Sequence, residues 1–382
     1  MANEVRTLIA VALALGGTTW LACGDSGQTT TGTGGASATG SGGMGPGAGG
    51  DLTVTVGVGG GNGGGIEGCD PQTFVLQQSP APQVYLVIDR SGSMSDPGAT
   101  MGLTKWDELN AATDTALTQY ESTIDFGLMM YPTGDECATE GPQVLFGPKN
   151  KTPIVGALQG TVPAGGTPTA AALNNAAASL TALGDPEAPK FVILATDGGP
   201  NCNYFLDASN DCSCTYAQAP YCCTSYPFSC VFGSSCLDDQ GTLDVIASLG
   251  TQGIGTFVIG LPGTTEYEGL LNAMAIAGGH PQMGGTTDYY AVTDQSSLLT
   301  ALQTIAVSVI SCQIHLDMAP QVPDGVSVFI DGQEVPRDKT KTNGWDYTDD
   351  TYLTIELYGM ACNELQNGDE HQLTATFECT VE

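Results

Sequence analysis

Five side chains in three short polar stretches of this sequence carry oxygen atoms that could bind a metal ion. They are Asp89, Ser91, Ser93, Thr167 and Asp197. The first three alternate in Asp-Arg-Ser-Gly-Ser, the fourth stands in Gly-Gly-Thr-Pro, and the fifth stands in Asp-Gly-Gly. Carboxylate and hydroxyl oxygens are hard ligands that select Mg²⁺, Ca²⁺ or Mn²⁺. The residue types therefore predict one divalent-cation site if the three stretches meet in space.

Buried strands are the elements that must bring these stretches together. Asp89 follows the apolar run Val84–Ile88, and Asp197 follows the last residue of the apolar run Phe191–Thr196. Thr167 precedes a proline that suits the first turn of a helix. Ligands of open α/β sheets bind beyond the carboxyl ends of the strands, so we expect the three loops to converge there. Taken singly, each stretch would favour a plain polar turn or helix start over a metal ligand.

Between residues 84 and 310, apolar runs of strand length alternate with Ala- and Leu-rich helical stretches. The predicted strands are Val84–Ile88, Phe126–Tyr131, Phe191–Thr196, Ile254–Leu261 and Tyr289–Val292. The predicted helices are Lys105–Ser122, Pro168–Leu183, Asp239–Gly250, Glu266–Ala277 and Gln295–Ile310. Most of these strands are apolar on both faces, which is typical of central strands covered by helices. The pattern predicts an α/β fold, a three-layer, doubly wound and mostly parallel sheet.

The five oxygen-bearing residues resemble the metal-ion-dependent adhesion site of von Willebrand factor A-type domains, in which Asp-x-Ser-x-Ser, a separate Thr and a separate Asp occupy three loops. The resemblance covers about residues 84 to 310 and implies a Rossmann-like fold. It implies one divalent cation, with Mg²⁺ as first choice and Ca²⁺ or Mn²⁺ as alternatives. The Ser and Thr hydroxyls would bind the ion directly, and the aspartates directly or through water. A protein or matrix partner would then offer a carboxylate to the ion.

The first 23 residues are typical of an export signal. Their apolar run, at residues 7–16, is too short to span a membrane. The Leu-Ala-Cys that ends this segment resembles a lipobox, which implies cleavage before Cys23 and lipidation of its thiol. The protein would then be lipid-anchored at the cell envelope or outer surface. Trp20 stands where Leu is usual, and Arg6 is the one positive charge of the leading segment, so ordinary secretion with cleavage elsewhere stays open.

Three further segments complete the predicted organisation. Residues 24–66 lack Lys, Arg and aromatic side chains and predict a flexible linker with a reach on the order of 35 Å, although residues 52–58 could instead form a strand. Residues 67–311 would hold the A-type domain. Residues 312–382 are strand-like, with Asp331-Gly332 as a hairpin signal, and predict a small disulfide-linked β module. This tail resembles modules that follow such domains in myxobacterial surface proteins.

The cysteine count is odd, at 13, and assigning one to the lipid leaves twelve for disulfides in an oxidising compartment. Seven lie in an insertion at residues 201–238, namely Cys202, Cys212, Cys214, Cys222, Cys223, Cys230 and Cys236. The other five are Cys69, Cys137, Cys312, Cys362 and Cys379. One cysteine of the insertion should therefore bond outside it, with Cys69 or Cys137 as candidates. Zinc is the alternative, but the paired Cys-x2-Cys spacing of common zinc sites is missing.

Charge and motifs narrow the function. Nine Lys and Arg against 41 Asp and Glu give a net charge of -32, which excludes nucleic acid as a partner and leaves the lipid as the sole membrane contact. His280, His315 and His371 stand in no protease or triad motif, and neither a phosphate loop nor a nucleophile elbow occurs, so we expect no enzyme. The sequence predicts cation-dependent adhesion or ligand binding. The alternative is a structural component of a cell-envelope assembly in which the metal only stabilises the loops, and the oligomeric state stays open.

Overall fold

The computed structural model describes residues 72–76, 79–134, 137–206, 212–215, 235–316 and 318–377. All of them belong to one compact unit, Ile66–Glu382. The predicted export signal, the predicted linker and six of the cysteines lie outside these ranges. The cysteines outside the described residues are Cys23, Cys69, Cys222, Cys223, Cys230 and Cys379. Within the described ranges, no helix has both the length and the apolar character needed to cross a membrane.

A six-stranded sheet forms the centre of the α/β part, with the strand order β4-β3-β2-β5-β6-β7. The strands are β2 (Gln83–Asp89), β3 (Asp125–Tyr131), β4 (Val144–Gly147), β5 (Lys190–Thr196), β6 (Ile254–Gly260) and β7 (Tyr290–Ala291). β2 pairs in parallel with β3 and β5, and β5, β6 and β7 continue in parallel, whereas β4 runs antiparallel to β3. The predicted α/β class with a mostly parallel sheet is therefore confirmed.

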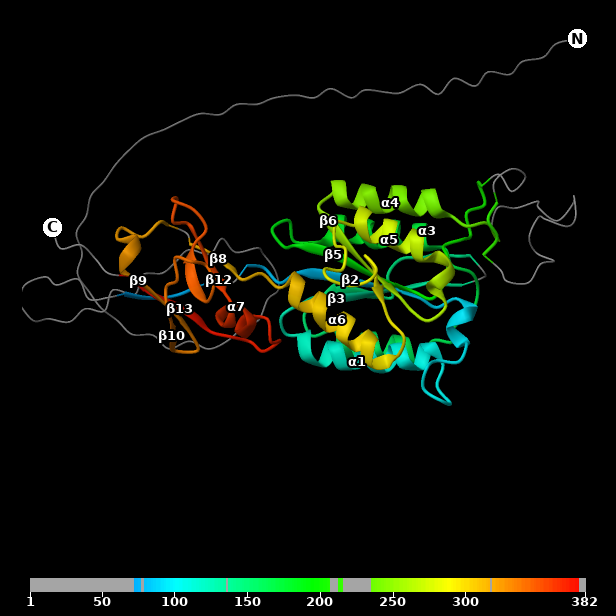
Figure 1. Cartoon of the computed structure of the whole chain (residues 1–382), viewed down its shortest axis with the longest axis horizontal. Coiled ribbons are helices and arrows are strands. Elements are labelled where there is room, and N and C mark those ends of the chain that lie inside the picture. Colours follow the sequence, from blue (N-terminus) through cyan, green and yellow to red (C-terminus); the bar gives the residue numbers. More distant parts are fainter. Residues whose placement is uncertain are drawn as a thin grey trace, which may run out of the picture. The chain divides into compact units, whose positions relative to one another are not determined.

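Helices cover both faces of this sheet (Figure 1). The helices are α1 (Lys105–Tyr120), α2 (Lys151–Gln159), α3 (Thr169–Leu183), α4 (Asp239–Thr251), α5 (Glu268–Ala277) and α6 (Gln295–Val309). Leu86 and Ile88 of β2 pack on the side of α1 and α6, whereas Tyr85 and Val87 pack on the side of α3, α4 and α5. Successive residues of a strand point to opposite faces, so one apolar run supplies two cores. The result is the three-layer arrangement that the sequence predicts.

Capping boxes mark the starts of two helices, α1 and α6. The Thr104 side chain accepts from the backbone of Asp107 while Asp107 reaches back to the Thr104 backbone, which is a capping box at the start of α1. Asp294 and Ser297 form the same arrangement at α6. β4 and α2 were not predicted. The apolar run of β4 is only three residues long and is partly exposed, which is too short for a clear strand signal.

The C-terminal part contains two small sheets, ordered β1-β13-β9-β10 and β11-β12-β8. Their elements are β1 (Gln72–Val75), β8 (Gln313–His315), β9 (Val326–Ile330), β10 (Gln333–Val335), β11 (Gly344–Tyr347), β12 (Thr354–Tyr358), α7 (Met360–Leu365) and β13 (Leu373–Phe377). β1 pairs antiparallel with β13, so the strand before β2 joins the C-terminal β part, whereas the sequence placed residues 67–311 in the A-type domain. A strand of four residues is too short for its sequence to predict which strand it pairs with. Trp345 is fully buried in the core of this part.

Candidate metal centre

The candidate ligands lie beyond the carboxyl ends of two neighbouring strands. Asp89 is the last residue of β2, and Asp197 directly follows β5. β2 stands between β3 and β5 in the sheet, so the chain builds outward from β2 first to one side and then to the other. Such a reversal of strand order leaves a crevice between the loops, which is where open α/β sheets bind ligands.

Hydrogen bonds connect four of the five predicted residues. The Ser91 backbone N–H donates to Asp89 Oδ1 at 2.8 Å, and the Ser91 and Ser93 hydroxyl oxygens lie 3.1 Å apart. Ser93 Oγ donates to Asp197 Oδ1 at 2.8 Å, across 104 residues of sequence. The Thr196 hydroxyl donates to Asp89 Oδ2 at 2.7 Å. The Asp-x-Ser-x-Ser loop and the loop after β5 therefore meet directly.

Thr167 joins this group through its backbone. Its N–H donates to the side-chain oxygen of Asn201 at 2.7 Å, and the N–H of Asn201 donates to the Thr167 carbonyl at 2.9 Å. In the same loop the Gly165 carbonyl accepts from the Gly92 N–H at 3.0 Å. The third loop is thus fastened to both of the others. Asn201 was not singled out in the sequence, where it looks like any polar residue of the insertion.

The two carboxylates of the site are buried. Asp89 is 0% exposed and Asp197 is 3% exposed. Burial, and then the charge of Asp197, raise the pKa of Asp89 to about 7. Burial and the charge of Asp89 also raise the pKa of the Tyr131 phenol, which lies at the end of β3. Two like charges held away from water are costly, and a cation between them would offset that cost.

Lys105, the first residue of α1, brings a positive charge to the same place. Its Nζ donates to Asp197 Oδ2 at 2.8 Å, and its side chain is only 9% exposed. Asp96 Oδ2 lies 4.0 Å from the same nitrogen. Sequence reasoning assigned Lys105 only to a helix start, because no local pattern connects it with a residue 92 positions away.

These residues fit a hard divalent cation. The donor set consists of two carboxylates and three hydroxyls, which are the ligand types that Mg²⁺, Mn²⁺ and Ca²⁺ accept. No group of three or more His, Cys, Asp or Glu side chains that could hold a metal occurs in the part of the chain that the structure describes. The ammonium of Lys105 already offsets part of the carboxylate charge at this place.

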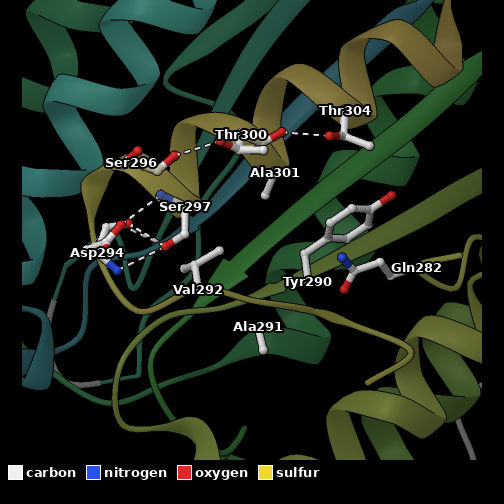
Figure 2. Close-up of a pocket in the computed structure, with 10 residues that line it drawn as sticks. All are labelled: Gln282, Tyr290, Ala291, Val292, Asp294, Ser296, Ser297, Thr300, Ala301 and Thr304. Carbon is white, nitrogen blue, oxygen red and sulfur yellow. Dashed lines mark hydrogen bonds between the residues drawn. The ribbon is translucent and has the colours of Figure 1, made fainter. Parts of the chain in front are cut away.

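A separate cavity of about 400 Å³ opens beside β7 and the first turns of α6 (Figure 2). It is lined by Gln282, Tyr290, Ala291, Val292, Asp294, Ser296, Ser297, Thr300, Ala301 and Thr304. Its polar groups are largely committed to the helix, since Asp294 caps α6 and the Thr300 hydroxyl donates to the Ser296 carbonyl at 2.9 Å. None of the five candidate ligands lines it.

Disulfides brace the loops around the site. Cys137, in the loop after β3, is bonded to Cys202, the residue that follows Asn201. Of the two outside partners expected for the insertion, the structure thus uses Cys137. Cys212 is bonded to Cys236 within the insertion, and Cys214 is also disulfide-bonded. In the C-terminal part, Cys312 is bonded to Cys362.

Comparison with known proteins identifies part of the chain. Residues 84–200 match the family model of the von Willebrand factor type A domain. Among curated proteins, no sequence matches this chain. The matched segment contains β3, β5, all but the first residue of β2, and all five candidate ligands.

Several solved structures are similar in shape. The pilus adhesin SpaC from Lactobacillus rhamnosus GG is 16% identical, with 79% of this chain and 40% of that chain covered and a TM-score of 0.44. The PilB minor pilin from Streptococcus sanguinis is 19% identical, with 60% and 61% covered and a TM-score of 0.43. The manganese-loaded TRAP protein of Plasmodium vivax is 17% identical, with 76% and 98% covered and a TM-score of 0.41. The chain thus spans less than two thirds of the length of the first two proteins, and at these values the likeness concerns the fold alone.

Proposed function

The chain contains a von Willebrand factor type A domain, and we propose on this premise that it binds one divalent cation and uses it for adhesion or ligand binding. The proposed ligands are Asp89, Ser91, Ser93, Thr167 and Asp197. Mg²⁺ is the first choice, and Ca²⁺ and Mn²⁺ are the alternatives. The proposed activity is binding without catalysis.

One contact carries the proposal: Ser93 Oγ donates to Asp197 Oδ1 at 2.8 Å. It brings together oxygens of two loops that leave neighbouring strands, next to the fully buried Asp89 carboxylate. When both are ionised, the two carboxylates carry two negative charges against the single buried positive charge of Lys105. A divalent ion at this place would offset the remaining negative charge with ligands that are already gathered.

The loops that lead away from the site offer a contact surface for a protein partner. Met101, between β2 and α1, is 99% exposed, and Phe205, after β5, is 98% exposed. Both loops start at the carboxyl edge of the sheet that carries the candidate ligands. Exposed apolar side chains on the loops that carry the candidate ligands suit a protein or matrix ligand that offers a carboxylate to the ion. The net charge of -32 speaks against nucleic acid.

The proposed location is outside the cytoplasm, at the cell envelope or outer surface. The disulfides Cys137–Cys202, Cys212–Cys236 and Cys312–Cys362 support this, because such bonds persist in oxidising compartments. Lipidation of Cys23, with the segment 24–66 as a linker, would hold the folded part at a membrane through the lipid alone. Both features rest on the sequence.

A structural role in an envelope assembly is the second candidate. It is favoured by the number of contacts that already hold the loops, above all the buried pair Lys105–Asp197 and the two hydrogen bonds between Thr167 and Asn201. In that case the cation would stabilise the loops, and no coordination position would be left for a partner.

Calorimetric titration of the full chain with Mg²⁺, Ca²⁺ and Mn²⁺ tests the proposal. We expect saturable binding of one ion by the natural protein and none by Asp89→Ala. Asp114→Ala is the matched control, because Asp114 lies on α1 and pairs with Lys151 away from the candidate ligands. Absence of binding by the folded natural protein would contradict the proposal.

Water-proton relaxation of the Mn²⁺-loaded protein separates the two candidates. An open coordination position holds an exchangeable water, so bound Mn²⁺ should enhance relaxation strongly, and acetate should reduce the effect by displacing that water. A loaded centre without exchangeable water would favour the structural role instead.

A further inference from the structure

Lys105 places a buried positive charge next to candidate ligands that are all carboxylates or hydroxyls. It lies 2.8 Å from Asp197 Oδ2, while the other oxygen of the same carboxylate, Oδ1, accepts from Ser93. Asp197 thus turns one oxygen toward the candidate cation ligands and the other toward Lys105. The side chains of Lys105 and Asp197 are 9% and 0% exposed, so water screens this pair very little.

The fold holds Lys105 in this position from several sides. Its backbone N–H donates to the Asp96 carbonyl at 3.0 Å, just inside the capping box that begins α1. The loop after β6 closes over the pair at Gly263, whose φ is +122°. A Cβ at Gly263 would lie 2.7 Å from the Asp197 carbonyl oxygen and 3.1 Å from Lys105 Nζ. Backbone therefore covers the ion pair on that side, and the ammonium cannot simply swing into water.

We propose that Lys105 is a fixed counter-charge of the cation centre, which weakens cation binding and gives the loaded centre a net positive charge that favours an anionic partner group. The inference rests on the proposed function. The buried carboxylates of Asp89 and Asp197, the ammonium and a divalent ion together leave one positive charge. The Asp96 carboxylate, 4.0 Å from Lys105 Nζ, is 65% exposed, so water screens its charge. In a chain with a net charge of -32, this would be a local positive site suited to a carboxylate.

Lys105 then acts in opposite directions on two kinds of ligand. Its charge repels the incoming cation and competes with it for Asp197, so the cation is held less tightly. The same charge attracts an anion to the loaded centre. A merely structural lysine would not shift these two affinities in opposite directions, which makes the pair of measurements diagnostic.

The test compares Lys105→Met and Lys105→Gln with the natural full chain. The glutamine can still donate a hydrogen bond to Asp197, so it keeps the proposal testable if the methionine variant fails to fold. Lys149→Met is the matched control, since Lys149 is a 68% exposed lysine that pairs with Glu370, and its replacement changes the net charge equally. Lys105→Arg keeps the positive charge.

Mn²⁺ affinity is measured by titration, and acetate binding to the Mn²⁺-loaded protein is measured by water-proton relaxation. We expect at least about tenfold tighter Mn²⁺ binding in the two neutral variants, with weaker acetate binding. The Mn²⁺ and acetate affinities of Lys149→Met and Lys105→Arg should stay within about threefold of those of the natural protein. Loss of a single buried charge should change them by more than that. Mn²⁺ binding by a neutral variant alone would also support the counter-charge.

Two results would overturn the inference, and they differ in what they say about the proposed function. If the natural protein binds Mn²⁺ and neither neutral variant binds it more tightly, the counter-charge is wrong and the cation centre stands. If neither the natural protein nor any variant binds Mn²⁺, both the counter-charge and the proposed function are wrong.

Discussion

Thr167 and Asn201 are joined by two hydrogen bonds of opposite direction, one from the Thr167 N–H to the Asn201 side-chain oxygen and one from the Asn201 N–H to the Thr167 carbonyl, at 2.7 and 2.9 Å. Asn201 stands four residues after Asp197. The segment that supplies one candidate ligand therefore also holds the loop of another. This connection makes the site a single unit built from three loops.

Replacing Asn201 should loosen the site without removing a ligand. Asn201→Ala leaves the buried Thr167 N–H without its acceptor, which should lower the free energy of unfolding by about 1–3 kcal/mol. Cation affinity should fall by about 10- to 100-fold, as for other residues that orient metal ligands. Denaturant unfolding and Mn²⁺ titration measure the two effects. The control is Asn175→Ala, which removes a side chain that donates to the carbonyls of residues 139 and 140. Its cation affinity should not change. Unchanged cation affinity in Asn201→Ala would contradict the prediction.

The Cys137–Cys202 disulfide should support the site through its neighbour Asn201. Replacing both cysteines by serine should lower the free energy of unfolding by about 2–4 kcal/mol and weaken Mn²⁺ binding, because the loop after Asp197 gains freedom. The matched control replaces both Cys312 and Cys362 by serine. Their disulfide closes a loop of similar length in the C-terminal β part. That variant should lose comparable stability and keep its Mn²⁺ affinity. Equal affinity in both double variants would contradict the prediction.

Gly263 is expected to be intolerant of any side chain. Its φ of +122° disfavours other residues, and a Cβ would meet the Asp197 carbonyl at 2.7 Å. Gly263→Ala should cost about 1–3 kcal/mol of stability and lower Mn²⁺ affinity. Gly284→Ala separates strain from contact, because Gly284 also has a positive φ, of +77°, but nothing lies within 4 Å of its Cβ position. The two variants are compared by urea unfolding and Mn²⁺ titration. If Gly263→Ala loses no more stability and no more Mn²⁺ affinity than Gly284→Ala, the loop can move to accept the side chain and the prediction is wrong.

A bound cation should raise thermal stability. At a free Mg²⁺ concentration of 100 times Kd, binding to the folded state alone contributes about 2.7 kcal/mol, which raises Tm by several degrees in a protein of this size. Chelation should remove the increase. Asp89→Ala should show no increase, and scanning calorimetry of both proteins with and without Mg²⁺ gives the comparison. An equal increase in the variant would place the ion elsewhere, for example on the acidic surface.

The sequence by itself determined the central strands and the kinds of side chain that follow them. Burial on both faces makes a central strand a continuous apolar run, so β2 and β5 are visible without the structure, and the polar residues that follow them stand out. The alternate spacing of Asp89, Ser91 and Ser93 can likewise be seen within one short stretch of sequence. These features need no knowledge of what lies across the sheet.

Only the tertiary structure decided which distant residues meet. Lys105 reaches Asp197 across 92 positions, and Asn201 reaches Thr167 across 34. β1 pairs with β13 from the opposite end of the described chain. A contact of this kind depends on how strands are ordered and where loops close, and a single lysine, asparagine or four-residue strand carries no periodic signal of its partner. The candidate ligands could therefore be proposed from the sequence, whereas the charge and the hydrogen bonds that surround them could not.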